Sequence, residues 1–423
     1  MTPPTDARLI AEKVARVSYG RLLAFLASRF RNLQRAEDAL ADAFVTALDR
    51  WPKEGVPSSP EGWILTVAKR NLLMLSRHNR VEDTFARATL EAPLEDEEAP
   101  NTFPDERLRM LFLCAHPSVE PSMRMPLMLQ VVLGLEAKQI AAALLVSPSA
   151  MAQRLVRTKA RLNGEEISFE IPSGDELESK LFSVLETIYA AYGLALDGIM
   201  ITGAAAAEMR EEALYLAELV VSLLPGEPEA MGLLALILFC ESRSRARISD
   251  AGEFVPLHAQ DTYLWNREQL LSAEQWLSRA SSFRRPGPLQ IEAAIQSAHS
   301  QRAATGVVPW WGIAELYSAL VALAPTIGAR VAQAIAVGES EGPTHGLALL
   351  NSLEHDEPKR INSHQPFWVA RAELAFRSQD FSLAKGSMIR AIGLSDRPEL
   401  RAYLLARVAH FERSADLHGG VDE

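Results

Sequence analysis

The chain has 423 residues, of which 48% are apolar and 23% charged, a globular balance that excludes a disordered chain. At about 150 residues per domain, this length predicts two to three domains. No apolar run approaches the roughly 18 to 20 residues of a membrane span. The first residues lack the basic and apolar pattern of a secretory signal, and the two cysteines, Cys114 and Cys240, form no disulfide framework. We therefore expect a cytoplasmic protein with no membrane partner.

The net charge of −11 is distributed unevenly along the chain. Residues 1–82 carry a net charge of +4, residues 83–106 one of −7 and residues 107–162 one of +6, whereas the remainder carries −14. Two small basic segments are thus separated by an acidic spacer and followed by a large acidic body, a pattern that favours local contact with nucleic acid. We predict domains at 1–82, 107–163 and 176–423, with an acidic linker at 83–106.

Helical periodicity is present nearly throughout, and strand signals are almost absent, so we predict an all-α fold. The first informative helix is expected over residues 36–51. Its apolar stripe consists of Leu40, Phe44, Leu48 and Trp51. The opposite face carries Asp38, Asp42 and Asp49. Taken alone, such an acidic face is usually only solvated.

A polar loop at residues 52–60 separates this helix from a second one, expected at about 61–79. The second helix opens with a tryptophan and continues with basic side chains: Trp63, Lys69, Arg70, Arg77 and Arg80. An aromatic ring and cations beside a polar loop can hold single-stranded DNA by stacking and by phosphate contacts.

Residues 135–162 give the strongest local signal, that of a helix-turn-helix. Ile140 and Leu144 are expected to point inward from the first helix, and Ser147 and Pro148 suit the start of the second. The buried face of the second helix is predicted to comprise Met151, Leu155, Thr158 and Leu162. The opposite face carries Ala150, Arg154, Arg157 and Arg161, with Ser149 and Gln153 near its N-terminus. This arrangement presents N-terminal side chains to bases and later cations to phosphates; the alternative is a helical hairpin with a solvated basic face.

The acidic C-terminal extension reads as successive helices joined by short Pro/Gly turns. One segment matches a tetratricopeptide-like hairpin at its tryptophan and three small residues: Trp368, Ala372, Ala384 and Ala391. Met388 replaces an aromatic residue of that repeat. An unrelated helical array is the alternative.

Catalytic and metal-binding signals are missing. The sequence has no phosphate-binding loop, dinucleotide fingerprint, metalloprotease motif or nucleophile elbow. Cys114 and His116 lie two positions apart without further ligands nearby, so Cys114 is better read as a small buried residue. We expect no catalytic residues, no metal and no cofactor, and therefore no enzyme.

The order of these segments resembles an RNA polymerase sigma factor of the extracytoplasmic-function group, which belongs to the sigma-70 family. Residues 36–44 resemble the acidic helix of that family, residues 60–71 its promoter-melting helix, and residues 136–162 its −35-reading helix-turn-helix. Segments at 105–117 and 150–157 resemble a subgroup with a long tetratricopeptide-like extension. The chain departs from the family at Arg70, where an asparagine is expected, and at Met74, where an aspartate is expected.

This resemblance implies roles for the residues singled out above. It implies a promoter-specificity subunit that binds the clamp and flap regions of core RNA polymerase together with promoter DNA. The acidic residues Asp38, Asp42 and Asp49 would bind the clamp. Contacts with the melted −10 element would come from Ser58, Ser59, Trp63, Lys69, Arg70, Asn71, Arg77 and Arg80. Contacts with the −35 duplex would come from Lys138, Ser149, Gln153, Arg154, Arg157, Lys159 and Arg161.

Several alternatives stay open at this point. The acidic linker either lies in the RNA path of the polymerase or is a solvated tether. The extension is expected to regulate activity through a protein partner, a ligand or contacts with the first two domains. One rival class is a helix-turn-helix regulator that binds duplex DNA without polymerase, usually as a dimer. The other is a tetratricopeptide-type scaffold, for which charge reversal at Arg154 and Arg157 has no effect on transcription.

Overall fold

The computed structural model describes residues 4–78, 105–144, 146–163, 171–196, 203–395 and 397–419. In these segments the regular elements are α-helices and three short 3-10 helices, with one isolated β-bridge between Ile248 and Phe254. The predicted all-α fold class is therefore confirmed. Most of the predicted acidic linker lies outside the described residues. The fold consists of two compact units, Met1–Leu219 and Val220–Glu423, whose boundary falls inside one helix.

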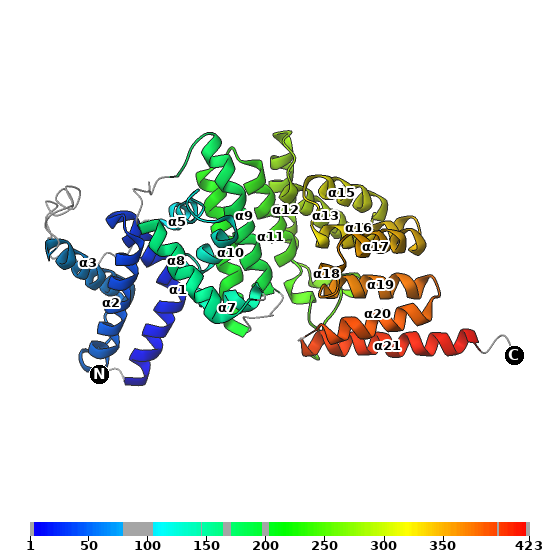
Figure 1. Ribbon diagram of the computed structural model, residues 1–423, viewed down its shortest axis with the longest axis horizontal. Coiled ribbons are helices and arrows are strands. Elements are labelled where there is room, and N and C mark those ends of the chain that lie inside the picture. Colours follow the sequence, from blue (N-terminus) through cyan, green and yellow to red (C-terminus); the bar gives the residue numbers. More distant parts are fainter. Residues whose placement is uncertain are drawn as a thin grey trace. The chain divides into compact units, whose positions relative to one another are not determined.

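The N-terminal unit begins with a three-helix bundle (Figure 1). The helices are α1 (Pro4–Phe30), α2 (Leu33–Glu54) and α3 (Pro60–His78). Each of the three packs on the other two. Asn32 starts α2, because its side-chain oxygen accepts a hydrogen bond from the Arg35 amide at 2.8 Å. Glu61 ties α3 to α1, because its carboxylate accepts hydrogen bonds from Arg21 at 2.6 Å and from the Ser18 hydroxyl.

Four shorter helices follow: α5 (Arg107–Cys114), α6 (Pro121–Val131), α7 (Ala137–Ala143) and α8 (Pro148–Asn163). Two longer helices then begin the C-terminal extension: α9 (Asp175–Leu196) and α10 (Gly203–Leu223). Helix α7 packs on α8, and α9 packs on both α5 and α6. The first part of the extension, α9 and most of α10, therefore belongs to the N-terminal unit.

The C-terminal unit is a succession of helices, each packed on its neighbours in the chain (Figure 1). Its longer helices are α11 (Pro228–Glu241), α12 (Arg267–Ser282), α13 (Pro288–Ser300), α15 (Trp310–Leu323), α16 (Ile327–Ser340), α17 (Pro343–Asp356), α19 (Gln365–Arg377), α20 (Phe381–Gly393) and α21 (Pro398–Gly419). Its short helices are η1 (Ser244–Ala246), η2 (Leu257–Ala259), η3 (Thr262–Leu264), α14 (Arg302–Thr305) and α18 (Pro358–Ile361). At the crossing of α16 and α17, a Cβ on Gly346 would lie 2.5 Å from the Ala334 carbonyl oxygen, so glycine permits this close approach.

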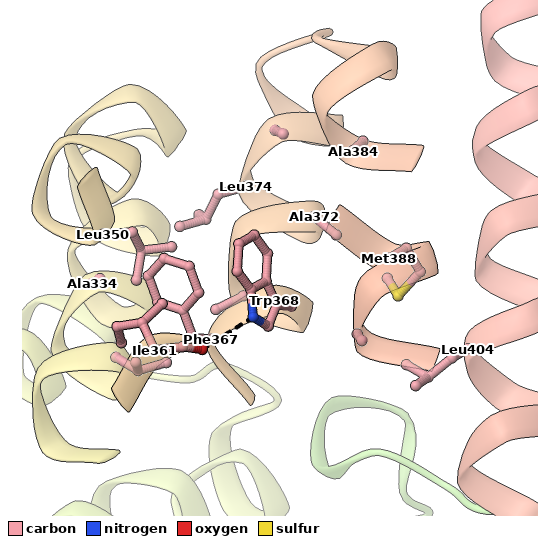
Figure 2. Close-up of a cluster of buried hydrophobic side chains, with 14 of the residues drawn as sticks. Ala334, Leu350, Ile361, Phe367, Trp368, Ala372, Leu374, Ala384, Met388 and Leu404 are labelled. Carbon is pink, nitrogen blue, oxygen red and sulfur yellow. Dashed lines mark hydrogen bonds between the residues drawn. The ribbon is translucent and has the colours of Figure 1, made fainter. Parts of the chain in front are cut away.

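The predicted hairpin forms from α19 and α20, as Figure 2 shows. Trp368, Ala372, Ala384 and Ala391 are all buried, and Met388 fills the position where the repeat has an aromatic residue. The indole Nε1 of Trp368 donates a hydrogen bond to the Ile361 carbonyl at 3.1 Å. Helix pairing and core positions thus agree with the prediction, whereas membership of the tetratricopeptide family stays a proposal.

Phe367 is fully buried in this cluster, and we expect Phe367→Ala to destabilise the C-terminal unit by about 3–5 kcal/mol. The loss combines the transfer free energy of the ring with the cavity left beside Leu350 and Ile361. Urea unfolding of the full chain measures it. Trp311→Ala is the matched control, because Trp311 is 72% exposed and its loss should change stability by less than about 0.5 kcal/mol. Equal effects of the two variants would contradict the assigned core.

Candidate nucleic-acid interface

Helix α2 presents an exposed acidic stripe. Asp38, Asp42 and Asp49 all lie on its exposed side. Asp38 accepts a hydrogen bond from Gln34 at 3.0 Å, whereas Asp49 pairs with Lys53 at 2.5 Å. This pairing with Lys53 lowers the pKa of Asp49 and offsets its charge. The uncompensated negative charge of the stripe therefore lies towards its N-terminal end.

The buried side of α2 differs from the predicted stripe. Leu40 and Trp51 are buried as expected, but Leu48 is 46% exposed, and Phe44 is only half-buried against Tyr19. The buried positions between them are alanines: Ala36, Ala39, Ala43 and Ala47. Small side chains let α1 and α3 approach α2 closely. The buried face of α2 is therefore centred on the alanines, and Ala39, Ala43 and Ala47 each lie one position before a large residue of the predicted apolar stripe.

Because the buried face of α2 is shifted in this way, exposed apolar side chains lie beside the acidic stripe, and the sequence pattern did not predict them. Val45 follows Asp38 and Asp42 at helical spacing, and Leu48 lies beside it; both are exposed. Acidic side chains around exposed apolar ones are typical of a protein-docking surface, where apolar contacts give affinity and charges set the partner. The sequence pattern places Leu48 on the buried face, and only the packing of the alanines in the structure shows that Leu48 is exposed.

The residues predicted to contact single-stranded DNA lie in the loop before α3 and in the first turns of that helix. Ser58 is exposed and Ser59 half-buried, and the Ser59 carbonyl accepts the Trp63 amide at 3.0 Å to start the helix. The Trp63 ring is half-buried, edge-to-face with buried Trp51 at 5.6 Å between ring centroids. Trp63 therefore divides its surface between the core and the outside, which leaves part of the ring for stacking.

The cations of α3 differ in exposure. Arg70 is exposed and Asn71 half-buried, whereas the Lys69 ammonium lies 5.1 Å from the centre of the Phe25 ring. Such a cation–π contact stabilises Lys69 against α1. The side chain of Arg77 and all of Arg80 lie outside the described residues.

Helices α7 and α8 pack on each other in the segment for which a helix-turn-helix is predicted. The Ser147 hydroxyl caps α8 by accepting the Ala150 amide at 3.2 Å, and Pro148 occupies the first turn. Met151, Leu155 and Leu162 are buried with Ile140 of α7, while Thr158 is half-buried. Leu144 differs from the prediction because it is 38% exposed: α7 ends at Ala143, so Leu144 leaves the helical face.

The outward face of α8 carries most of the predicted duplex contacts. Its exposed side chains are Ser149, Gln153, Arg154, Arg157 and Arg161. Lys138, on α7, is also exposed and pairs with Glu136 at 2.8 Å. A capped N-terminus followed by arginines on one face has the geometry of a recognition helix, which can enter a major groove.

Lys159 is placed differently from the other cations of α8. Its ammonium contacts the Glu37 carboxylate of α2 at 2.9 and 3.0 Å, and the two side chains are only 13% and 12% exposed. Burial raises the pKa of Glu37, and the ion pair with Lys159 opposes that rise. Lys159 thus faces the neighbouring domain in this arrangement, while the arginines face outward.

The described residues contain no group of three or more His, Cys, Asp or Glu side chains that could hold a metal ion. Cys114 is fully buried, and burial raises the pKa of its thiol well above the usual range, so it behaves as the small apolar residue that the sequence predicted. None of the described helices is long and apolar enough to cross a membrane.

Parts of the chain are similar in sequence to known protein families, and nearly the whole chain is similar to one relative. A sequence model of sigma-70 region 2 matches residues 16–81, which cover most of α1 together with α2 and α3. Residues 180–281 match the family of unknown function DUF6596. An uncharacterised protein of Rhizobium meliloti (strain 1021) is 33% identical over 388 residues, which cover 90% of this chain and 91% of that protein. No solved structure matches the chain.

The matched region 2 comprises the acidic helix α2 and the tryptophan-bearing helix α3, and it supports a specificity subunit of RNA polymerase. The chain belongs to the same full-length family as the Rhizobium meliloti protein, and its region 2 supports a sigma factor of the sigma-70 family. A sigma factor binds RNA polymerase and promoter DNA, and its family is non-catalytic.

Proposed function

We propose that this sigma factor belongs to the extracytoplasmic-function group and directs transcription from promoters that it reads at two elements. Helix α8 reads the −35 element as duplex, and the segment from Ser58 to Asn71 holds the −10 element as a separated strand. The observation that carries the proposal is the exposed arginine face of the capped helix α8, in the same chain as a sigma-70 region 2. The protein acts in the cytoplasm, where its polymerase lies.

Polymerase binding is proposed for the stripe on α2 formed by Asp38, Asp42, Val45 and Asp49. A basic helix of the polymerase clamp would pair with Asp38 and Asp42, and Val45 and Leu48 would lie beneath it. Asp49 is the weakest contributor of the three acids because Lys53 already offsets its charge. The region around α5 to α8 would bind the flap, as the resemblance implies.

Strand separation is proposed for the loop before α3 and for α3 itself. The loop, with Ser58 and Ser59, would receive an extruded base, which costs a few kcal/mol of unstacking that contacts in the loop must offset. The outer part of the Trp63 ring would stack on a base, and Arg70 would contact phosphates. Permanganate reactivity of unpaired thymines near −10, with polymerase and this protein present, tests strand separation.

The roles of the arginines on α8 differ with their distance from its N-terminus. Ser149, Gln153 and Arg154 are nearest the bases, and Arg157 and Arg161 nearest the phosphates. We expect Arg154→Ala to cost about 1–3 kcal/mol and to relax preference at one −35 position, whereas Arg161→Ala should weaken all promoters alike and reduce the slope of log affinity against log salt by about 1. Binding of holoenzyme to a set of −35 point variants measures both effects. Uniform losses from Arg154→Ala would reassign it to a phosphate.

The C-terminal extension is proposed to regulate this activity. The part of the chain after residue 162, which includes the extension, carries a net charge of −14, and this charge discourages nonspecific contact with DNA. A helical succession offers an extended surface for a protein partner or a ligand. The acidic linker of residues 83–106 is proposed either to lie in the positively charged RNA path or to act as a tether.

A further inference from the structure

Helix α8 and helix α2 contact each other within the N-terminal unit, through the buried pair of Lys159 and Glu37. Removing one partner of a buried ion pair leaves an uncompensated charge, so this contact holds the helices together only while both residues are in place. Lys159 and Glu37 are 122 residues apart in the sequence and belong to the two domains that carry the proposed promoter contacts.

A second contact between these domains depends on a glycine. Gly20 of α1 is buried, and a methyl group at its Cβ position would overlap the carbonyl oxygen of Val132, the residue that follows α6. Glycine within a helix costs stability relative to alanine. The close approach of α1 and α6 gives a physical reason for glycine at this position.

The first two helices of the extension contact both domains. On the first domain, Arg16 of α1 pairs with Glu208 of α10 at 2.9 Å. On the second domain, Arg107 of α5, which Asp105 orients at 2.6 Å, pairs with Glu212 of α10. The buried Thr187 hydroxyl of α9 donates to the Met128 sulfur of α6 at 3.1 Å. Helices α9 and α10 therefore bridge the domains that α2 and α8 belong to.

This packing is incompatible with simultaneous reading of two promoter elements. Elements at −10 and −35 are separated by more than two turns of duplex, each about 34–36 Å long. Domains joined by a buried ion pair at 2.9 Å and by a glycine contact lack that separation. Lys159 is also withdrawn from any phosphate.

We propose that the N-terminal unit is a closed state of the sigma factor, in which the Glu37–Lys159 pair latches α8 to α2 and helices α9 and α10 hold the latch shut. Polymerase binding to α2 opens the latch, because a basic helix at Asp38 brings positive charge beside Glu37 and competes with Lys159. This inference rests on the proposed function and gives the extension a specific role within it.

The test uses the full chain with Gly20→Ala. If α1 and α6 are packed in solution, the added methyl group separates them, and the latch opens. Dyes on Arg29→Cys and Ser122→Cys report the distance between the domains in a Cys240→Ser background, since Cys114 is fully buried. Gly386→Ala is the matched control, because a Cβ on this helical glycine would meet nothing within 4 Å. Glu37→Gln provides a second opening variant that retains side-chain size.

We expect Gly20→Ala and Glu37→Gln to lower energy transfer and to raise the affinity of the free protein, by about 10-fold or more, for a DNA that joins a −35 duplex to a single-stranded −10 element. A binding-competent state that is rarely populated reduces apparent affinity by its population. Core polymerase should lower energy transfer in the unmodified chain. Unchanged energy transfer and affinity in both variants, as in Gly386→Ala, would overturn the closed state. Lower energy transfer without duplex binding by any form would retain the closed state and refute the proposed reading of DNA by α8.

Discussion

Charge reversal at Asp38 and Asp42 together is expected to lower affinity for core RNA polymerase by more than about 100-fold. The two carboxylates are exposed one helical turn apart at the N-terminal end of the α2 stripe. Arginines there would face the basic clamp helix proposed as the partner, and apposed like charges cost several kcal/mol in an interface. Titration of labelled core polymerase with Asp38→Arg, Asp42→Arg protein measures the loss.

The control for this experiment reverses two other exposed acids on a helix. Glu211→Arg with Glu218→Arg, on α10, changes the net charge by the same amount two turns apart. That variant should bind polymerase as the unmodified chain does. Retained binding by the α2 variant, with its helical content intact by circular dichroism, would contradict the assignment of the stripe to polymerase.

Charge reversal on the outward face of α8 has the second large expected effect. Arg154→Asp with Arg157→Asp should reduce promoter-specific transcription by about 100-fold or more, since each good contact with a base edge is worth about 1–3 kcal/mol and reversed charges repel phosphates. Polymerase binding through α2 should change little. Multi-round transcription at saturating sigma factor separates the two steps, because excess protein compensates for weak polymerase binding but not for lost promoter recognition.

A matched pair of exposed cations in the C-terminal unit serves as control. Lys359→Asp with Arg413→Asp makes the same change in net charge far along the sequence. This variant should transcribe normally. Transcription that survives reversal at Arg154 and Arg157 would instead support the scaffold alternative, in which the basic helices have no role in promoter recognition.

Local sequence signals predicted the elements that depend on local physics. The cap at Ser147 and the buried face of Met151, Leu155 and Leu162 follow from propensity and spacing within one helix, and the structure has them as predicted. The α19–α20 hairpin likewise follows from Trp368 and its alanine partners. In both places, the residues that decide the packing lie close together in the sequence.

Features that depend on distant packing were not predictable from these signals. Leu48 was expected to be buried, but alanines fill the core side of α2, and nothing local to residues 36–51 shows that α1 and α3 approach so closely. Lys159 was grouped with the arginines of α8, since helical spacing cannot reveal Glu37 on another domain. The contacts of α9 and α10 with the earlier helices follow from no local pattern, because they join distant residues: Thr187 and Met128 are 59 residues apart, and Arg107 and Glu212 are 105 apart.

Run-off transcription on fragmented genomic DNA, with purified core RNA polymerase and with or without this protein, tests the central claim most directly. The account predicts new transcripts whose start sites share one pair of upstream elements, and predicts their loss when Arg154 and Arg157 are reversed. No new transcript from the unmodified protein or from the Gly20→Ala variant, combined with tight duplex binding by the free chain, would contradict it and support a regulator that acts without polymerase.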